Sequence, residues 1–196
     1  MSIAFSIESK KKKNILKAFI YYLQKMPTSN TALVLIGLQE LRREKKSDYY
    51  LRNMEPLIER AIYLLDYARD MGYKIIFIKH LEEEGDFAKD NPLSEIISDL
   101  EVQEWDVIIE KRKTSCFLWT NLEKELEDIE NIVVAWIPTN LCVRMFVEEA
   151  YDREFNIAVI EDACQTYNDN LQDFTLNDLD ESRPDLNIIR LEKFID

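Results

Sequence analysis

The sequence predicts a single soluble α/β domain built on a parallel β-sheet. Short apolar runs alternate with helix-period segments along the chain, which is the pattern of successive βαβ units. The runs are rich in Ile and Val, as expected of strands that are buried on both faces. A length of 196 residues, with 46% hydrophobic and 32% charged content, fits one globular domain.

Six apolar runs are predicted to be strands because they share this short, β-branched character. In chain order they are Ala32–Leu38, Lys74–Ile78, Val107–Ile109, Ile132–Trp136, Ile157–Ile160 and Asn187–Leu191.

Helical spacing predicts a helix over Pro56–Met71, with proline near its first turn and Gly72 as its C-cap. Thr120 and Glu123 match a capping box for a helix that ends near Glu130. A helix over Thr139–Arg153 carries an apolar stripe that should face the core. The stripe consists of Val143, Phe146, Val147, Ala150 and Tyr151.

The chain is predicted to divide into an N-terminal helical extension with its linker, residues 1–29, and a domain over residues 30–196. The extension contains a helix-like segment at Asn14–Lys25. The stretch Thr166–Pro184, rich in Asn and Asp, is the least patterned part of the domain and is a candidate to cover or edge a site.

Composition excludes several classes of partner. A formal net charge of −13 argues against a protein that tracks nucleic-acid phosphates. No run approaches the roughly 20 apolar residues of a bilayer-spanning helix, and the N-terminus lacks a signal pattern. Cys116, Cys142 and Cys164 have neither the even count nor the spacing of a disulfide framework. We therefore expect a cytoplasmic protein that binds neither nucleic acid nor membrane.

Functional residues are expected just after the strands, because ligands of open parallel sheets bind beyond the carboxyl ends of the strands. The segments selected in this way are Gly37–Leu41, His80, Glu110–Phe117, Trp136–Cys142 and Glu161–Thr166.

Cys142 is the most informative of these residues, since Thr139-Asn140-Leu141-Cys142 places a thiol in the first turn of a predicted helix. Unpaired N–H groups and the helix dipole there favour a thiolate, and the same N–H groups suit an oxyanion. The alternative is a small core residue, the common role of a free cysteine.

Lys111 ends an otherwise apolar strand, so its ammonium either reaches the rim or enters the site. Near Cys142 it would stabilise the thiolate and polarise a substrate carbonyl. The alternative is an ordinary surface lysine.

Four segments together resemble the isochorismatase-like cysteine hydrolases, which include nicotinamidases, N-carbamoyl amide hydrolases and isochorismatases. They are Ala32 to Gln39, Glu110 to Phe117 followed by Thr120 and Leu122, Val133 to Val143 followed by Ala150 and Phe155, and Val159 to Ala163. The resemblance runs from about Thr31 to the C-terminus. It implies a three-layer α/β/α fold with a six-stranded parallel sheet, and a homo-oligomer, dimer or tetramer.

By this resemblance Cys142 is the nucleophile and Lys111 the assisting lysine, while Gly37 stands where the family has its catalytic aspartate. Gly37 has no group to move a proton, which would forfeit a contribution of roughly 100- to 10,000-fold. Glu40 is the nearest carboxylate in sequence, and a bend after the strand would bring it towards the site in place of the aspartate. The alternative is a solvated glutamate in a charged loop. If the thiol is reactive, Gly37→Asp is expected to raise hydrolysis.

Further residues are assigned to the pocket or the oxyanion site by the same resemblance. They are Trp136, Ile137, Pro138, Thr139, Leu141, Trp119, Phe117, Gln39 and His80. Trp119 and Trp136 replace glycines of the family, so they either narrow or line the cleft, or pack in the core. The Ile137–Pro138 bond is predicted to be cis, as the family's loop typically is.

No metal site and no cofactor are expected. The family's nicotinamidases use an Asp-x-His pair with a further histidine, whereas this sequence holds one histidine, His80. His80 is either a polar strand-end residue or part of the pocket.

The function predicted first is cysteine-dependent hydrolysis of a small amide or ester through Cys142 and Lys111. The alternative is a catalytically inactive relative that binds a small molecule or a protein partner through the same cleft. A vinyl-ether hydrolase of the isochorismatase type ranks last, because in that branch the aspartate is central and the cysteine is dispensable.

Overall fold

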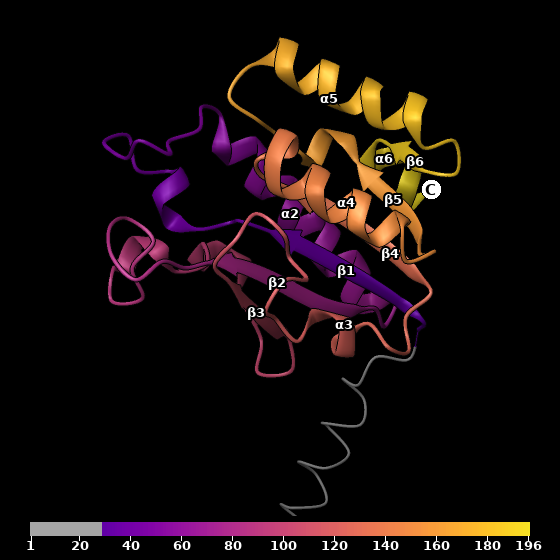
Figure 1. Ribbon diagram of the computed structural model, residues 1–196, viewed down its shortest axis with the longest axis horizontal. Coiled ribbons are helices and arrows are strands. Elements are labelled where there is room, and N and C mark those ends of the chain that lie inside the picture. Colours follow the sequence, from indigo (N-terminus) through magenta and orange to yellow (C-terminus); the bar gives the residue numbers. More distant parts are fainter. Residues whose placement is uncertain (1–28) are drawn as a thin grey trace, which may run out of the picture.

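The computed structural model describes residues 29–196 as an α/β domain with a six-stranded, entirely parallel sheet. The strand order is β3-β2-β1-β4-β5-β6 (Figure 1). The strands are β1 (Thr31–Ile36), β2 (Lys74–His80), β3 (Val107–Lys111), β4 (Asn131–Trp136), β5 (Asn156–Ile160) and β6 (Asn187–Ile189). Each predicted strand is confirmed within a few residues. The predicted helix at Asn14–Lys25 lies outside the described residues.

Helices cover both faces of the sheet, which confirms the three-layer arrangement. Residues of α2 (Met54–Asp70) and α6 (Leu191–Ile195) pack with alternate strand residues into one core cluster. Residues of α3 (Leu122–Glu125), α4 (Arg144–Tyr151) and α5 (Asp169–Ser182) pack on the opposite face (Figure 1). The predicted stripe on α4 is buried there, because every third or fourth position of the helix points at the sheet.

Short turns connect these elements at the carboxyl edge of the sheet. They are the 3-10 turns η1 (Glu40–Arg42), η2 (Pro92–Ser94), η3 (Ser98–Leu100) and η5 (Glu161–Ala163), and the π-helical turn η4 (Thr139–Val143). β1 pairs with both β2 and β4, and Ile36 aligns with Ile78 and with Trp136. The segments that follow these three residues therefore meet at one place.

The predicted capping box at Thr120 is wrong, and the helix it opened is much shorter. The Thr120 hydroxyl donates to the carbonyl of Cys116 at 2.7 Å and accepts from the N–H of Leu122 at 3.3 Å, not from that of Glu123. Asn121 takes the N-cap position without a side-chain bond. The hydroxyl is thus used to close the preceding loop, and α3 keeps about one turn.

The stretch Thr166–Pro184 is not unpatterned, since α5 occupies most of it. Asn168 caps the helix by accepting from the N–H of Leu171 at 3.0 Å. Thr175 and Leu179, four residues apart, are its buried positions. This narrow buried stripe explains why the composition concealed the helix. None of the helices in residues 29–196 has the length and apolarity needed to cross a membrane.

Candidate active site

The turn that holds Cys142 follows directly from β4. The Ile137–Pro138 peptide is cis, as predicted. The N–H groups of Leu141 and Val143 both donate to the carbonyl of Pro138, at 3.2 and 3.3 Å. The chain therefore enters α4 through a π-helical turn rather than a regular first turn, and Cys142 is half-buried within it.

Lys111 lies against this cysteine at the end of β3. Its Nζ donates to Cys142 Sγ at 3.2 Å, to the carbonyl of Lys113 at 2.7 Å and to that of Thr114 at 3.1 Å. These contacts use all three protons of the ammonium, whose residue is 1% exposed. Lys111 is therefore not a surface lysine, and its fixed ammonium lies in direct contact with the Cys142 sulfur.

The other two cysteines are buried in the core. Burial raises the pKa of the Cys116 thiol far above its ordinary value. Burial also raises the pKa of Cys164 to about 12, although the N–H of Trp136 donates to its Sγ at 3.3 Å. These thiols are therefore protonated near neutral pH.

Gly37 has a backbone conformation that an aspartate would occupy only under strain. Its φ is +75°, and a Cβ at this position would lie 2.5 Å from the carbonyl oxygen of Ile137. That contact is with backbone, which has little freedom to move. The expectation that Gly37→Asp raises hydrolysis therefore does not suit this structure, because the nucleophile loop occupies the space that the side chain needs.

Glu40 does not supply the missing carboxylate at Cys142. Its Oε1 accepts from the N–H of Ser98 at 2.9 Å, and its Oε2 lies 3.8 Å from Arg43. Glu40 therefore holds η3 against η1.

Gln39 joins the ends of two central strands. Its Nε2 donates to the carbonyls of His80 and Ser94, at 2.8 and 2.6 Å, and its Oε1 accepts from the N–H of His80 at 2.9 Å. With 1% exposure it positions the backbone instead of facing a ligand.

His80 is the register partner of Lys111 across β2 and β3. Its Nε2 lies 3.0 Å from Glu82 Oε1, and its Nδ1 is buried without a hydrogen-bond partner. Burial lowers the pKa of His80 below its ordinary value, and the charges of Lys111 and Arg42 act in the same direction while Glu82 opposes them. The ring is therefore neutral near neutral pH, and with Nε2–H donating to Glu82 it carries a lone pair on Nδ1.

Several predicted pocket residues lie in the core instead. Trp136 is fully buried in the cluster on the α2 face, as is Ile137, and Pro138 and Thr139 are buried as well. Phe117 stacks on Phe146 with ring centroids 5.7 Å apart. Trp136 and Phe117 therefore fill the two cores, because sheet faces covered by helices leave room for large apolar side chains.

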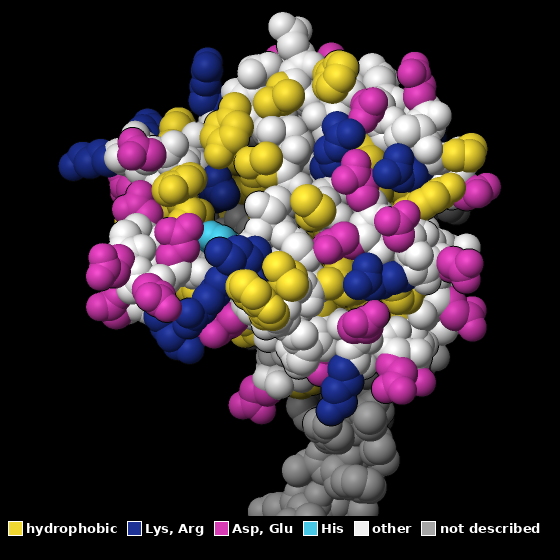
Figure 2. Space-filling view, viewed as in Figure 1, with side chains coloured by type: hydrophobic (Ala, Val, Ile, Leu, Met, Phe, Trp, Pro, Cys, Tyr) yellow, Lys and Arg dark blue, Asp and Glu magenta, His cyan; other side chains and the backbone are white. Residues whose placement is uncertain are grey.

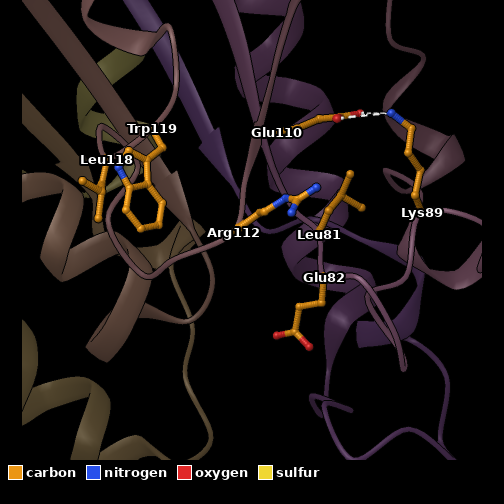
Figure 3. Close-up of a pocket in the computed structure, with 7 residues that line it drawn as sticks. All are labelled: Leu81, Glu82, Lys89, Glu110, Arg112, Leu118 and Trp119. Carbon is orange, nitrogen blue, oxygen red and sulfur yellow. Dashed lines mark hydrogen bonds and ion pairs between the residues drawn. The ribbon is translucent and has the colours of Figure 1, made fainter.

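Trp119 and Leu141 are exposed, at 79% and 48%. Trp119 lines a 190 Å³ pocket beside edge strand β3. In Figure 3 Trp119 and Leu118 face Leu81 and Lys89 across Arg112. The two tryptophans thus do not share one cleft.

The sequence reasoning missed Arg42, which is 6% exposed. It stands one residue beyond the segment Gly37–Leu41 selected after the first strand, so a slightly longer segment would have included it. It also missed Glu82, which bonds His80, and the bond from the Ser115 hydroxyl to Glu149 at 2.7 Å, which ties the loop after β3 to α4.

Within residues 29–196, no group of three or more His, Cys, Asp or Glu side chains is placed to hold a metal ion.

A doubly covered parallel sheet with a cysteine and a lysine paired beyond its carboxyl edge defines an α/β protein of the hydrolase type. A family model described as the isochorismatase domain matches residues 31–184. The chain therefore belongs to the isochorismatase family of hydrolases, as its motifs predict.

Relatives at low identity agree with this assignment. Nicotinamidase 3 of Arabidopsis thaliana is 26% identical over 165 residues, covering 76% of this chain and 79% of the relative. The ureidoacrylate amidohydrolase RutB of Acinetobacter baylyi is 24% identical over 187 residues, with 76% of each covered.

Solved structures show the same fold. A cysteine hydrolase from Pseudomonas syringae superposes with a TM-score of 0.78 at 20% identity, covering 86% of this chain and 93% of that one. The pyrazinamidase of Pyrococcus horikoshii, solved in complex with zinc, superposes with a TM-score of 0.73 at 18% identity. The match covers 83% of this chain and 99% of that one.

The Gly37 geometry predicts that restoring the family's aspartate destabilises the protein. Gly37→Asp and Gly37→Ala should both lower the free energy of unfolding, each by about 1–3 kcal/mol, because both add a Cβ at positive φ against a carbonyl. Urea unfolding measures this, with Gly85→Ala as the control, since Gly85 also has positive φ but nothing within 4 Å of its Cβ position. Aspartate tolerated without loss, together with increased hydrolysis, would contradict this account.

The burial of the cysteines predicts selective alkylation. Iodoacetamide should label Cys142 in the folded protein while Cys116 and Cys164 react only after unfolding, because their raised pKa values and burial withhold the thiolate. Peptide mass spectrometry between pH 6 and 9 measures the three rates. Equal labelling of all three cysteines in the folded state would contradict the burial and the raised thiol pKa values of Cys116 and Cys164.

Proposed function

We propose that the protein is a cysteine-dependent hydrolase of small esters or amides, with Cys142 as nucleophile and Lys111 as its partner. The observation that carries the proposal is the 3.2 Å contact between Lys111 Nζ and Cys142 Sγ, with the ammonium fixed by two backbone carbonyls. A thiolate held beside a buried cation attacks a carbonyl without first giving its proton to an aspartate.

In the acylation step, Sγ of Cys142 bonds to the carbonyl carbon and the substrate oxygen becomes an oxyanion. The Lys111 ammonium and the N–H of Cys142 itself stabilise this charge. Collapse breaks the bond to the leaving group and leaves a thioester on Cys142. The leaving group takes its proton from solvent, since Gly37 offers none.

Deacylation requires a base, and we assign this role to His80. Its neutral ring has an unpartnered Nδ1, and Glu82 holds its Nε2. Nδ1 takes a proton from water as the water oxygen adds to the thioester carbon. The C–S bond then breaks, which releases the acid and returns the thiolate to Lys111, and protonated His80 gives its extra proton to solvent.

The missing aspartate sets the substrate preference. An amide nitrogen must be protonated to leave, whereas an activated ester expels an oxygen anion that needs no acid. We therefore expect esters of acidic alcohols to be hydrolysed in preference to amides.

The alternative is a catalytically inactive member that binds a small molecule or a protein partner through the same cleft. The Gly37 backbone favours it, because the Ile137 carbonyl blocks a side chain at the position of the family's aspartate. A protein that binds small carboxylic acids or their derivatives yet leaves activated esters intact would establish this alternative.

Substitution of the pair should abolish hydrolysis of 4-nitrophenyl acetate. Cys142→Ala should reduce the rate to that of the uncatalysed reaction, and Lys111→Gln should lower kcat/KM about 100-fold or more, as loss of an oxyanion donor does. Lys113→Gln is the matched control. The Lys113 side chain is exposed, and the residue contacts Lys111 only through its backbone carbonyl, which the substitution keeps. Circular dichroism checks that each variant is folded. Undiminished hydrolysis by Cys142→Ala would end the proposal.

The role of His80 predicts an acid limb in the pH–rate profile. The base is active when neutral, so kcat should fall as the pH drops through a pKa that burial has lowered below about 6.5. His80→Gln should lower deacylation and remove this limb, whereas Glu83→Gln, an exposed neighbour that pairs with Arg112, should not. A profile unchanged by His80→Gln would exclude the histidine as the base.

A further inference from the structure

We propose that Arg42 forms an anion subsite and that the substrate of this hydrolase carries a carboxylate. That the bound anion is a substrate depends on the proposed function. That an anion binds at Arg42 is argued from the surroundings of Arg42 alone. The chemical class proposed is a monoester of a short dicarboxylic acid.

Arg42 is a buried cation without a carboxylate partner in residues 29–196. It is 6% exposed, its Nε has no hydrogen-bond partner, and NH1 reaches only the carbonyl of Tyr49 at 3.4 Å. The adjacent Arg43 is more exposed yet pairs with Asp99 at 2.7 Å and Glu55 at 3.2 Å. A buried charge that is left unpaired is costly, so an unpartnered guanidinium indicates a place for an anion.

Aromatic rings hold the guanidinium in position. Its Cζ lies 5.5 Å from the ring centroid of Tyr49 and 5.7 Å from that of Phe87. The two rings meet edge to face at 4.7 Å. Such packing fixes the plane of a guanidinium, and the Nε–H of Arg42 is left without a hydrogen-bond partner in the described residues.

A path of contacts connects Arg42 to the reactive pair. Phe87 lies between Arg42 and His80, with the Phe87 and His80 centroids 4.8 Å apart. His80 is the register partner of Lys111, whose Nζ touches Cys142. Figure 2 shows the chain's one histidine, in cyan, at the edge of a hollow, with Lys and Arg side chains on both sides of it.

The surroundings of His80 contain cations in an otherwise acidic chain. The chain has a formal net charge of −13, which repels anions over most of its surface. Beside the hollow, Arg42 and Lys111 both act on His80, and the Glu82 carboxylate is already bonded to that ring. Two cations therefore lie close to the one histidine of an acidic chain, and in this proposal the substrate carboxylate binds Arg42 while its carbonyl points towards Cys142.

The binding test uses glutarate and requires no catalysis. Calorimetric titration of the full chain should show glutarate binding, and Arg42→Gln should weaken it about 10-fold or more, as expected for loss of a charged hydrogen-bonding partner. Arg42→Lys, which keeps the charge without the planar fork, should give an intermediate loss. Arg43→Gln should bind like the unaltered chain. If Arg42→Gln does not fold, glutarate affinity is compared between Arg42→Lys and Arg43→Gln. Weaker binding by Arg42→Lys supports the subsite, and equal binding overturns it.

The kinetic test compares mono-4-nitrophenyl glutarate with neutral 4-nitrophenyl butyrate at constant ionic strength. The ratio of their kcat/KM values should favour the anionic ester and fall about 10-fold in Arg42→Gln, mainly through KM. Absence of glutarate binding, or binding equal in Arg42→Gln, would overturn the subsite. Binding that depends on Arg42 without hydrolysis of either ester would retain the subsite and overturn the hydrolase.

Discussion

The carbonyl oxygen of Ile137 occupies the space in which a side chain at position 37 would begin. β1 and β4 are neighbours, so the loop that follows β4 passes over the end of β1, and a Cβ there would be 2.5 Å from that oxygen. Gly37 tolerates both the approach and its positive φ. The same loop carries the cis Ile137–Pro138 bond and the π-helical turn that presents Cys142. One backbone arrangement thus both crowds out a side chain at position 37 and presents the Cys142 thiol.

Two buried cations, Lys111 and Arg42, lie near His80 in a protein of formal net charge −13. Lys111 is fixed by two carbonyls and faces Cys142, and Arg42 is held by aromatic rings without a carboxylate partner in the described part of the chain. Both charges help to keep His80 neutral. In the proposed function, the neutral His80 acts as base, Cys142 beside Lys111 acts as nucleophile and Arg42 binds the anion, which favours an anionic ester over an amide.

The strands and the long helices were predictable because their signals are local. Buried strands need continuous apolar runs, and α2 needs an apolar stripe, so sequence periodicity located both. Cys142 and Lys111 were predictable because each lies directly after or at the end of a strand. Their contact was not predictable from strand adjacency, because β2 and β1 lie between β3 and β4, yet Lys111 Nζ lies 3.2 Å from Cys142 Sγ.

The features that could not be predicted from the sequence depend on packing between distant segments. The roles of Trp136 and Phe117 depended on which core had room for them, and nothing local distinguishes a buried indole from one that lines a pocket. The block at Gly37 depends on a residue a hundred positions away, so the missing aspartate was visible but its cause was not. Whether a carboxylate lies near Arg42 likewise depends on the tertiary fold, which leaves its Nε without a partner.

The central claim is that a reactive thiol survives without the aspartate. The most direct measurement mixes the protein with excess 4-nitrophenyl acetate, quenches in acid within one turnover, and maps acetylated peptides by mass spectrometry. The account predicts a single acetyl group on Cys142 that disappears on longer incubation and accumulates in His80→Gln. Acetyl groups on surface lysines alone, or an unmodified Cys142 at every time, would contradict it.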